Sequence, residues 1–158
     1  MAFVAERGLF ARFTGDWVGD ERVAKSDFSA AGTALARLTF RTVADGAFLA
    51  VDYLEEGGPG VKGHGVIGFD EQRSVYTLHW FDNAGAPPST AAIAHAHGDE
   101  LAFAANYGTH FGRTVFIAGD NELRFRVEMQ KPDQPMVVVV DAVLAKIDGG
   151  VTLEDARA

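Results

Sequence analysis

The stretch VKGHGVIGFDEQRSVYTLHWFD, residues Val61 to Asp82, decides the fold of this chain. It contains two runs in which apolar and polar residues alternate, separated by the turn-forming segment Asp70 to Arg73. Alternation with a period of two is typical of half-buried strands, because successive side chains point to opposite faces of a sheet. The stretch therefore predicts a β-hairpin.

The two faces of this hairpin differ in polarity. A symmetric loop across Asp70 to Arg73 predicts that His64 lies opposite His79. The apolar face then carries Val61, Ile67, Phe69, Tyr76, Leu78 and Trp80, and the other face carries Lys62, His64, Val66, Thr77, His79 and Phe81. We expect the apolar face to point inward, because burial of apolar area stabilises the fold. Gly63 and Gly65 leave space beside the Trp80 indole and Leu78.

Similar runs extend in both directions from the hairpin. They predict ten strands, at about residues 14–24, 32–43, 47–56, 61–69, 74–82, 89–97, 100–106, 111–118, 122–130 and 136–147. The connections are short, which suits an up-and-down meander. The fold class is therefore all-β, with a single ten-stranded antiparallel barrel over about residues 13–147.

A short helix is expected before the barrel. Residues 2–12 place Phe3, Leu9 and Phe10 on one helical face that continues to Phe13, so this helix should cap one end of the barrel. The tail from Asp148 to Ala158 reads as a frayed end or a turn of helix. The 158 residues form one domain, which is large enough to bury about two-thirds of its unfolded surface.

Three tight turns predict the register of neighbouring strands. Asp45-Gly46 suits a two-residue hairpin loop that pairs Leu38 with Tyr53 and Phe40 with Val51. A slip by one residue would bury Arg37 and Arg41, so the apolar face of this pair should point inward. Gly98-Asp99 and Asp120-Asn121 predict two further hairpins.

Composition excludes several classes of function. The net charge is −8 and the sequence pI is about 5.0, so phosphate backbones and anionic membrane surfaces would repel the chain. There is no cysteine, which excludes disulfides, thiolate metal sites and cysteine nucleophiles. No apolar run reaches the length of a membrane span. We expect a soluble cytoplasmic protein that binds neither nucleic acid nor membrane.

A ten-stranded barrel is wider than its own side chains fill easily. Part of the predicted wall is small, at Ala92, Ala94 and Ala96 and at the two glycines of the central hairpin, so either the helix or an apolar ligand must fill the gap. The leading hypothesis is a non-catalytic protein that holds a small apolar or aromatic molecule in the barrel. The predicted ligand-binding residues are Tyr53, Phe69, Tyr76, Leu78, Trp80, Phe103 and Phe125.

Two alternatives stay open at this point. The first is a small barrel enzyme of the isomerase, cyclase or hydrolase type, with His64 and His79 as acid and base if they face the lumen. The second is a dimerising module whose barrel is filled, so a homodimer is a possible assembly. Fold alone does not choose among these classes.

Three groups of polar residues suggest sites, each with a simpler interpretation. His95, His97 and Glu100 could ligate zinc, or form a solvated face beside a turn. A carboxylate-binding cluster could form inside the barrel, or the same residues could form surface ion pairs; they are Arg37, Arg41, Arg124, Arg126, Asp52 and Glu128. Asp16, Asp20 and Glu21 could be catalytic carboxylates, or mark a rim. No metal site is predicted.

Several motifs resemble known barrel proteins. FTGDWVGDE (Phe13 to Glu21) resembles the opening strand of lipocalin-like and nitrobindin-like barrels. The segments DGAFLAVDY, GHGVIGFD and HWFDNAG, which begin at Asp45, Gly63 and His79, resemble the bacterial lipocalin-like family called domain of unknown function 1579. The resemblance implies a calycin-type barrel. Nitrobindin-like barrels bind haem through a histidine near the C-terminal end of the sheet, but residues 136–147 contain none, so no cofactor is predicted.

Overall fold

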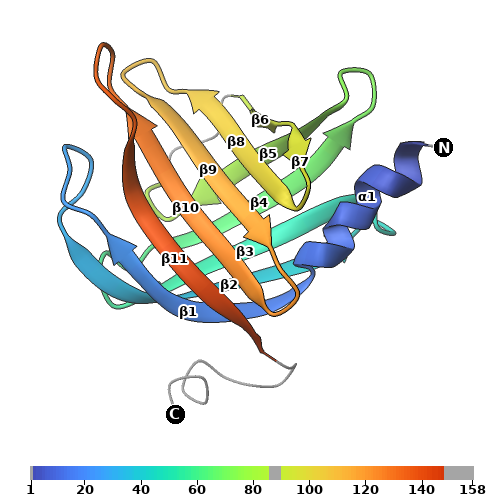
Figure 1. The fold of residues 1–158 in the computed structure, drawn as a ribbon, viewed down its shortest axis with the longest axis horizontal. Coiled ribbons are helices and arrows are strands. Elements are labelled where there is room, and N and C mark those ends of the chain that lie inside the picture. Colours follow the sequence, from blue (N-terminus) through green and yellow to red (C-terminus); the bar gives the residue numbers. More distant parts are fainter. Residues whose placement is uncertain (1, 86–89, 148–158) are drawn as a thin grey trace.

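The computed structural model describes residues 2–85 and 90–147, with side chains from Gly8 onward. One helix precedes a series of antiparallel strands (Figure 1). The elements are α1 (Ala2–Phe13), β1 (Gly15–Val23), β2 (Gly32–Val43), β3 (Phe48–Glu56), β4 (Lys62–Asp70), β5 (Val75–Asp82), β6 (Ala92–Ala94), β7 (Ala96–His97), β8 (Glu100–Asn106), β9 (Phe111–Ala118), β10 (Glu122–Gln130) and β11 (Val137–Ile147).

The strands form a closed ten-stranded antiparallel barrel, as the sequence predicts. Strands that are neighbours in the chain pair with one another, apart from β6 and β7. β1 also pairs with β11, and β6 closes the ring by pairing with both β5 and β8. β6 and β7 together occupy the position of one predicted strand, interrupted at His95. The first residue predicted for that strand, residue 89, lies outside the described residues.

All three predicted tight turns are confirmed, as is the register at Asp45-Gly46. Leu38 pairs with Tyr53 and Phe40 with Val51, while Asp45 and Gly46 both take the positive φ that their turn requires. The loops at residues 98–99 and 120–121 also join the strands predicted for them.

The predicted pairing within the central hairpin is wrong by two residues. His64 lies opposite Phe81, not His79, and Gly65 lies opposite Trp80. The loop consists of residues 71–74, where the Asp70 carboxylate accepts hydrogen bonds from backbone N–H groups and Ser74 takes a positive φ of 52°. A shift of two residues keeps each side chain on its predicted face, so the apolar face still points inward.

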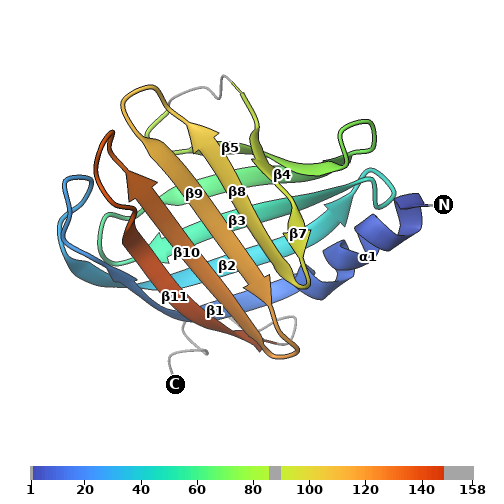
Figure 2. The same ribbon diagram turned by 45° about the horizontal axis from the view of Figure 1, so that its top comes forward.

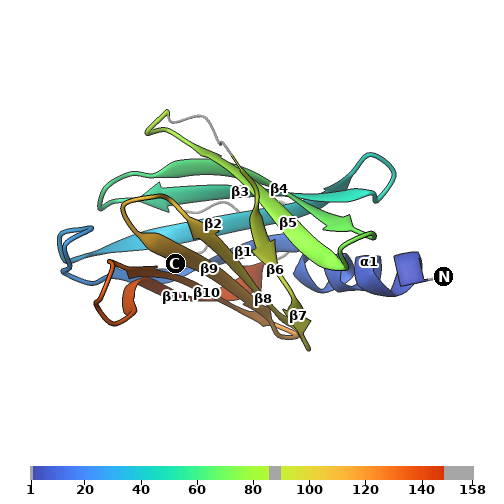
Figure 3. The ribbon, with the colours of Figure 1, turned by 90° about the horizontal axis from the view of Figure 1, so that it is seen from above.

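The helix lies at one end of the barrel (Figure 3). Phe10 and Phe13 are buried in the core, and Leu9 packs against it. The Phe13 ring lies 5.5 Å from the Phe40 ring and 6.5 Å from the Phe116 ring, so the helix provides part of the filling of the barrel. Phe3, predicted for the same face, lies outside the described side chains, as do residues 148–158 of the tail.

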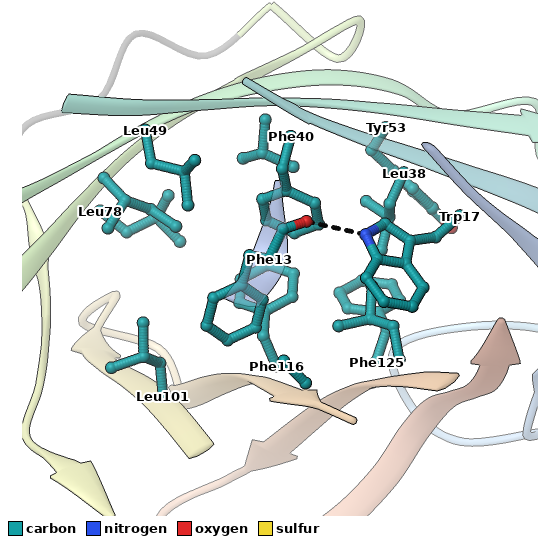
Figure 4. Close-up of a cluster of buried hydrophobic side chains, with 14 of the residues drawn as sticks. Phe13, Trp17, Leu38, Phe40, Leu49, Tyr53, Leu78, Leu101, Phe116 and Phe125 are labelled. Carbon is teal, nitrogen blue, oxygen red and sulfur yellow. Dashed lines mark hydrogen bonds between the residues drawn. The ribbon is translucent and has the colours of Figure 1, made fainter. Parts of the chain in front are cut away.

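Ion pairs connect the helix to the rim of the barrel. Arg12 donates to both carboxylate oxygens of Asp99 at 3.1 Å and to Asp120 at 2.9 Å. At the helix terminus, the Trp17 indole N–H donates to the Phe13 carbonyl at 2.8 Å (Figure 4). The core side chains of Figure 4 extend from this bond to Leu49 and Leu101, which face one another from β3 and β8. The loops at the other end of the barrel are seen in Figure 2.

Candidate functional site

Two buried carboxyl groups and a tyrosine lie inside the barrel, in the half away from the helix. Glu21 comes from β1, and Tyr53 and Glu55 come from β3. Strand alternation turns them inward, since Glu21 follows Trp17 at an even spacing and Glu55 follows Tyr53. None of the three side chains is more than 6% exposed. We call Glu21, Tyr53 and Glu55 the acidic cluster.

Small neighbours leave room for the acidic cluster. Glu21 pairs with Ala34 on one side and with Ala142 on the other, and Glu55 pairs with Ala36. All three alanines are buried. A carboxyl side chain can therefore extend into the interior at a place where larger side chains would fill the space.

The Tyr53 hydroxyl joins the two carboxyl groups. It lies within hydrogen-bond distance of Glu21 Oε1 and at 3.0 Å from Glu55 Oε1. The other oxygen of Glu55 accepts a hydrogen bond from the backbone N–H of Val61 at 3.0 Å. The other oxygen of Glu21 is buried and has no hydrogen-bond partner among the described residues. The acidic cluster therefore lacks one hydrogen-bond donor, the one that would satisfy this oxygen.

Burial changes the protonation of this cluster. Desolvation, together with the neighbouring Glu55, raises the pKa of Glu21 to about 8. Desolvation and the two carboxyl groups also raise the pKa of Tyr53. The Tyr53 hydroxyl has one proton and can donate it to only one ionised carboxylate. Both of its contacts, with Glu21 and with Glu55, can be hydrogen bonds when Glu21 carries a proton. At neutral pH the acidic cluster therefore holds a proton that an exposed carboxyl group would have released.

Aromatic rings surround the acidic cluster. The Tyr53 ring lies 5.3 Å from the Phe125 ring and 6.3 Å from the half-buried Trp80 indole. The indole rests on two glycines, because a Cβ at Gly63 would lie 2.1 Å from its Cζ2 and one at Gly65 would lie 2.8 Å from its Cε3. The space that the sequence predicts beside these glycines is therefore occupied by Trp80, with Leu78 also against Gly65.

The mouth next to Trp80 carries further polar groups. The indole N–H of Trp80 donates to Asp82 at 3.2 Å. Tyr107 is 60% exposed, and partial desolvation of its phenol, together with the charge of Asp82, raises its pKa. The Tyr107 ring stacks on His110 at 5.0 Å and covers Gly112 on the inner side of β9. Trp80 thus has a polar rim on one side and the acidic cluster on the other.

The predicted ligand-binding residues separate into two groups. Trp80, Tyr53 and Phe125 meet at the acidic cluster. Nearer the helix, the Phe69 and Tyr76 rings lie 4.9 Å apart and the Phe10 ring lies 6.3 Å from Tyr76. The remaining two, Leu78 and Phe103, are buried in the core, where Phe103 lies 6.2 Å from Phe116. The helix therefore occupies the space beside the second group.

The histidines of the central hairpin lie on the outside. His64 alternates with the inward-facing glycines, its side chain is 43% exposed, and its Nδ1 lies 2.7 Å from Asp52 Oδ1. His79 is also exposed. The structure brings neither into the barrel nor pairs one with the other, so the enzyme alternative has no support from these two residues.

The charged residues of the other strands form pairs on the outer face. Arg37 binds Asp16 at 3.0 Å, and Arg41 binds Asp52 at 2.5 Å. The interpretation as surface ion pairs is therefore the right one for these residues. Asp20 and Arg124 are exposed.

Glu128 is an exception among these outer residues, because it is buried. Its carboxylate accepts from Arg126 at 2.7 Å and from Arg113 at 2.9 and 2.5 Å, just after a register shift in β10. Arg113 is not among the residues of the predicted carboxylate-binding cluster. A carboxylate that is removed from water here is thus neutralised by two guanidinium groups.

The possible zinc ligands do not gather into a site. His95 and His97 are exposed beside the turn at Gly98-Asp99. Within residues 2–85 and 90–147, no three histidine, aspartate or glutamate side chains are grouped closely enough to hold a metal ion. In the same ranges, no helix is long and apolar enough to cross a membrane.

The sequence predicts only part of this site. Glu21 is among the predicted carboxylates of the first strand, either catalytic or at a rim, and the structure buries it inside the barrel, whereas Glu55 is not among the predicted residues. Alternation alone identifies both, since each continues the inward face of its strand beyond an aromatic residue. The general rule that charged residues avoid the interior opposes that assignment.

Comparisons with known proteins agree with the fold. The crystal structure of Rv2717c from M. tuberculosis superposes with a TM-score of 0.67 at 17% sequence identity, covering 89% of this chain and 96% of that chain. At this identity the likeness shows the fold alone. No curated protein matches the chain. A family model described as "Protein of unknown function (DUF1579)" matches residues 4–149. The chain therefore belongs to the DUF1579 family.

Proposed function

We propose that this protein is a non-catalytic, lipocalin-like binding protein that takes a small aromatic molecule at Trp80, Tyr53 and Phe125. The observation that carries the proposal is the position of Trp80. Its indole is half-buried, rests on Gly63 and Gly65, and stands beside two further aromatic rings at the mouth away from the helix. Ligand pockets commonly combine such rings with a few polar groups that fix the orientation of the ligand.

The dense packing of aromatic rings in the other half of the barrel supports this location. The Phe13, Phe40 and Phe116 rings lie within 5.5 to 6.5 Å of one another in the half that the helix closes. Of the two halves, the one with the acidic cluster is therefore the better candidate for a ligand. Aromatic side chains there supply contact area, and contact area supplies most of the binding energy.

Tryptophan fluorescence tests the proposal, because the chain has two tryptophans and one of them is in the proposed site. The neutral probe is 1-naphthalenemethanol. Trp17→Phe leaves Trp80 as the emitting residue, and Trp80→Phe leaves Trp17. We expect a saturable change of emission in wild type and in Trp17→Phe, and its loss in Trp80→Phe. No saturable change in wild type, or an equal change in both variants, would exclude the proposed site.

The possible homodimer is a second proposal with its own support. β11 exposes Val137, Val138 and Val143, three apolar side chains on one strand. Sedimentation velocity of wild type and of Val143→Asp tests it. A dimer that the substitution converts to a monomer supports the proposal, and a wild-type monomer at all concentrations excludes it.

The cytoplasm is the proposed location in a bacterial cell. The absence of cysteine from 158 residues is compatible with a reducing compartment. Cell fractionation with an antibody against the protein tests this location.

A further inference from the structure

We infer that the acidic cluster binds the protonated amine of the aromatic ligand, so that the ligand class is a small aromatic ammonium compound. This inference rests on the proposed function and specifies the polar group that the aromatic ligand carries. Its basis is a difference between two buried carboxyl sites in the same chain.

The first step is the comparison with Glu128. That carboxylate is 4% exposed and is neutralised by Arg113 and Arg126. Glu21 and Glu55 are equally buried, yet no lysine, arginine or histidine of the described chain forms an ion pair with either of them. A buried carboxylate without a cation costs several kcal/mol. The acidic cluster therefore lacks the positive charge that the chain supplies at Glu128.

The second step is the unpartnered oxygen. Glu21 Oε2 is buried without a hydrogen-bond donor within residues 2–85 and 90–147. The adjacent acceptors, Glu21 Oε1, the Tyr53 hydroxyl and Glu55 Oε1, already lie within reach of one another. The missing component is thus a donor with a positive charge. An ammonium group has both, with up to three N–H bonds for the two carboxyl groups.

The third step excludes the other common cation. Divalent metal ions bind six or more oxygen ligands, or four ligands when the ion is zinc. The described residues offer two carboxyl groups and a phenol here, and no group of three metal-binding side chains. An organic ammonium needs fewer ligands. Tyr53 and Trp80 add aromatic faces, which attract cations.

The fourth step concerns the proton that Glu21 holds in the free protein. Because the pKa of Glu21 is raised to about 8, its carboxyl group is mostly protonated at pH 7. An ammonium group stabilises the ionised carboxylate, so binding should expel that proton. The groups that face Glu21 are Tyr53 and Glu55, and the proton that Glu21 loses leaves to solvent.

Three probes with one ring system test the inference: 1-naphthylmethylamine, 1-naphthalenemethanol and 1-naphthoate. They carry a cation, a neutral hydroxyl and an anion. We expect the amine to bind wild type at least 10-fold more tightly than the alcohol, and the anion to bind most weakly. Amine and alcohol of equal affinity, or a tighter anion, would overturn the inference while leaving the proposed function intact. No binding by any of the three would overturn both.

Variants locate the preference in the acidic cluster. Glu21→Gln and Glu55→Gln should reduce the ratio of amine affinity to alcohol affinity from at least 10-fold to about threefold or less. Asp20→Asn is the matched control, because it removes a negative charge from the neighbouring position, where the side chain is exposed. If Asp20→Asn weakened amine binding as much as the two cluster variants do, the overall negative charge of the protein, and not the acidic cluster, would attract the amine.

Proton release gives a readout that uses wild-type protein. Calorimetry of amine binding at pH 7, repeated in buffers of different ionisation enthalpy, should show release of close to one proton. The alcohol should release none. Amine binding without proton release would contradict the exchange of a proton for the ammonium group at Glu21.

Discussion

Trp80 lies across Gly63 at a distance that excludes a methyl group between them. An added Cβ at Gly63 would lie 2.1 Å from Cζ2 of the indole and 2.7 Å from Cη2. The glycine thus sets the position of the ring. The proposed ligand site depends on that position, because the indole stands over Tyr53 and next to Asp82.

Gly63→Ala should therefore displace the indole and destabilise the protein. Overpacking in a filled site costs about 1–3 kcal/mol, which denaturant unfolding can measure. The emission of Trp80 in the Trp17→Phe background should move to longer wavelength as the ring becomes more exposed. Gly32→Ala is the control, since nothing lies within 4 Å of a Cβ at that strand position. Unchanged emission in Gly63→Ala would refute the contact.

The stability of the protein should fall as the pH rises from about 5 to about 8. The pKa of Glu21 is raised to about 8 in the folded state, whereas an unfolded glutamate titrates near pH 4.3. Between these values the folded protein binds more protons than the unfolded chain, so the free energy of unfolding decreases with pH. The other carboxyl groups with shifted pKa, such as Asp16 and Asp52, have lowered values and act at lower pH.

Glu21→Gln should remove most of that pH dependence. The amide resembles the protonated carboxyl group, so the variant should equal wild type near pH 5 and exceed it in thermal stability near pH 8.5. Thermal unfolding at a series of pH values measures both curves. Parallel curves for wild type and variant would show that the proton does not reside on Glu21.

Phe13→Ala should be among the most destabilising substitutions in the helix. Its ring is fully buried against Phe40 and Phe116, and removal of a buried phenylalanine side chain costs about 3–5 kcal/mol. Arg12→Ala removes the adjacent, partly exposed ion pairs and should cost much less. If the two substitutions have equal effects on the free energy of unfolding, the helix does not fill the barrel.

Glu128 provides a coupling experiment. Arg113→Met leaves the buried carboxylate with one guanidinium group and should cost about 1–3 kcal/mol, less than for a fully buried pair because Arg113 is partly exposed. Adding Glu128→Gln should restore part of that loss, since the unpaired charge disappears. A double-mutant cycle measures the coupling, and additive effects would show that the pair is not coupled.

The fold could be predicted from the sequence because alternation and turn residues act locally. The Asp45-Gly46 turn gives the register of its strands directly, since both residues take positive φ. The same reasoning gave the wrong register for the hairpin whose loop follows Asp70. The Asp70 carboxylate accepts hydrogen bonds from the backbone N–H groups of Gln72 and Arg73, and Ser74 takes a positive φ, so the loop is centred one residue later than predicted. The residue types of the segment do not distinguish these two positions of the loop.

The candidate site was harder to predict because it depends on contacts between distant strands. Trp80, Tyr53 and Phe125 were expected to face inward, and they do. Their meeting around Tyr53, whose hydroxyl contacts Glu21 and Glu55, could not be foreseen, because it requires the shear of the closed barrel. The filling of the centre by Phe10 and Phe13 was one of two open possibilities, and the depth to which the helix enters depends on packing alone.

Methyl NMR during titration with 1-naphthylmethylamine tests the central claim most directly. In alanine-labelled protein, the methyl groups of Ala34, Ala36 and Ala142 report on the neighbourhood of Glu21 and Glu55, while those of Ala94 and Ala118 report on the other half of the barrel. We predict saturable shifts of the first three and small shifts of the other two. Shifts concentrated at Ala94 and Ala118, or no saturable shift at any of the five, would contradict the account.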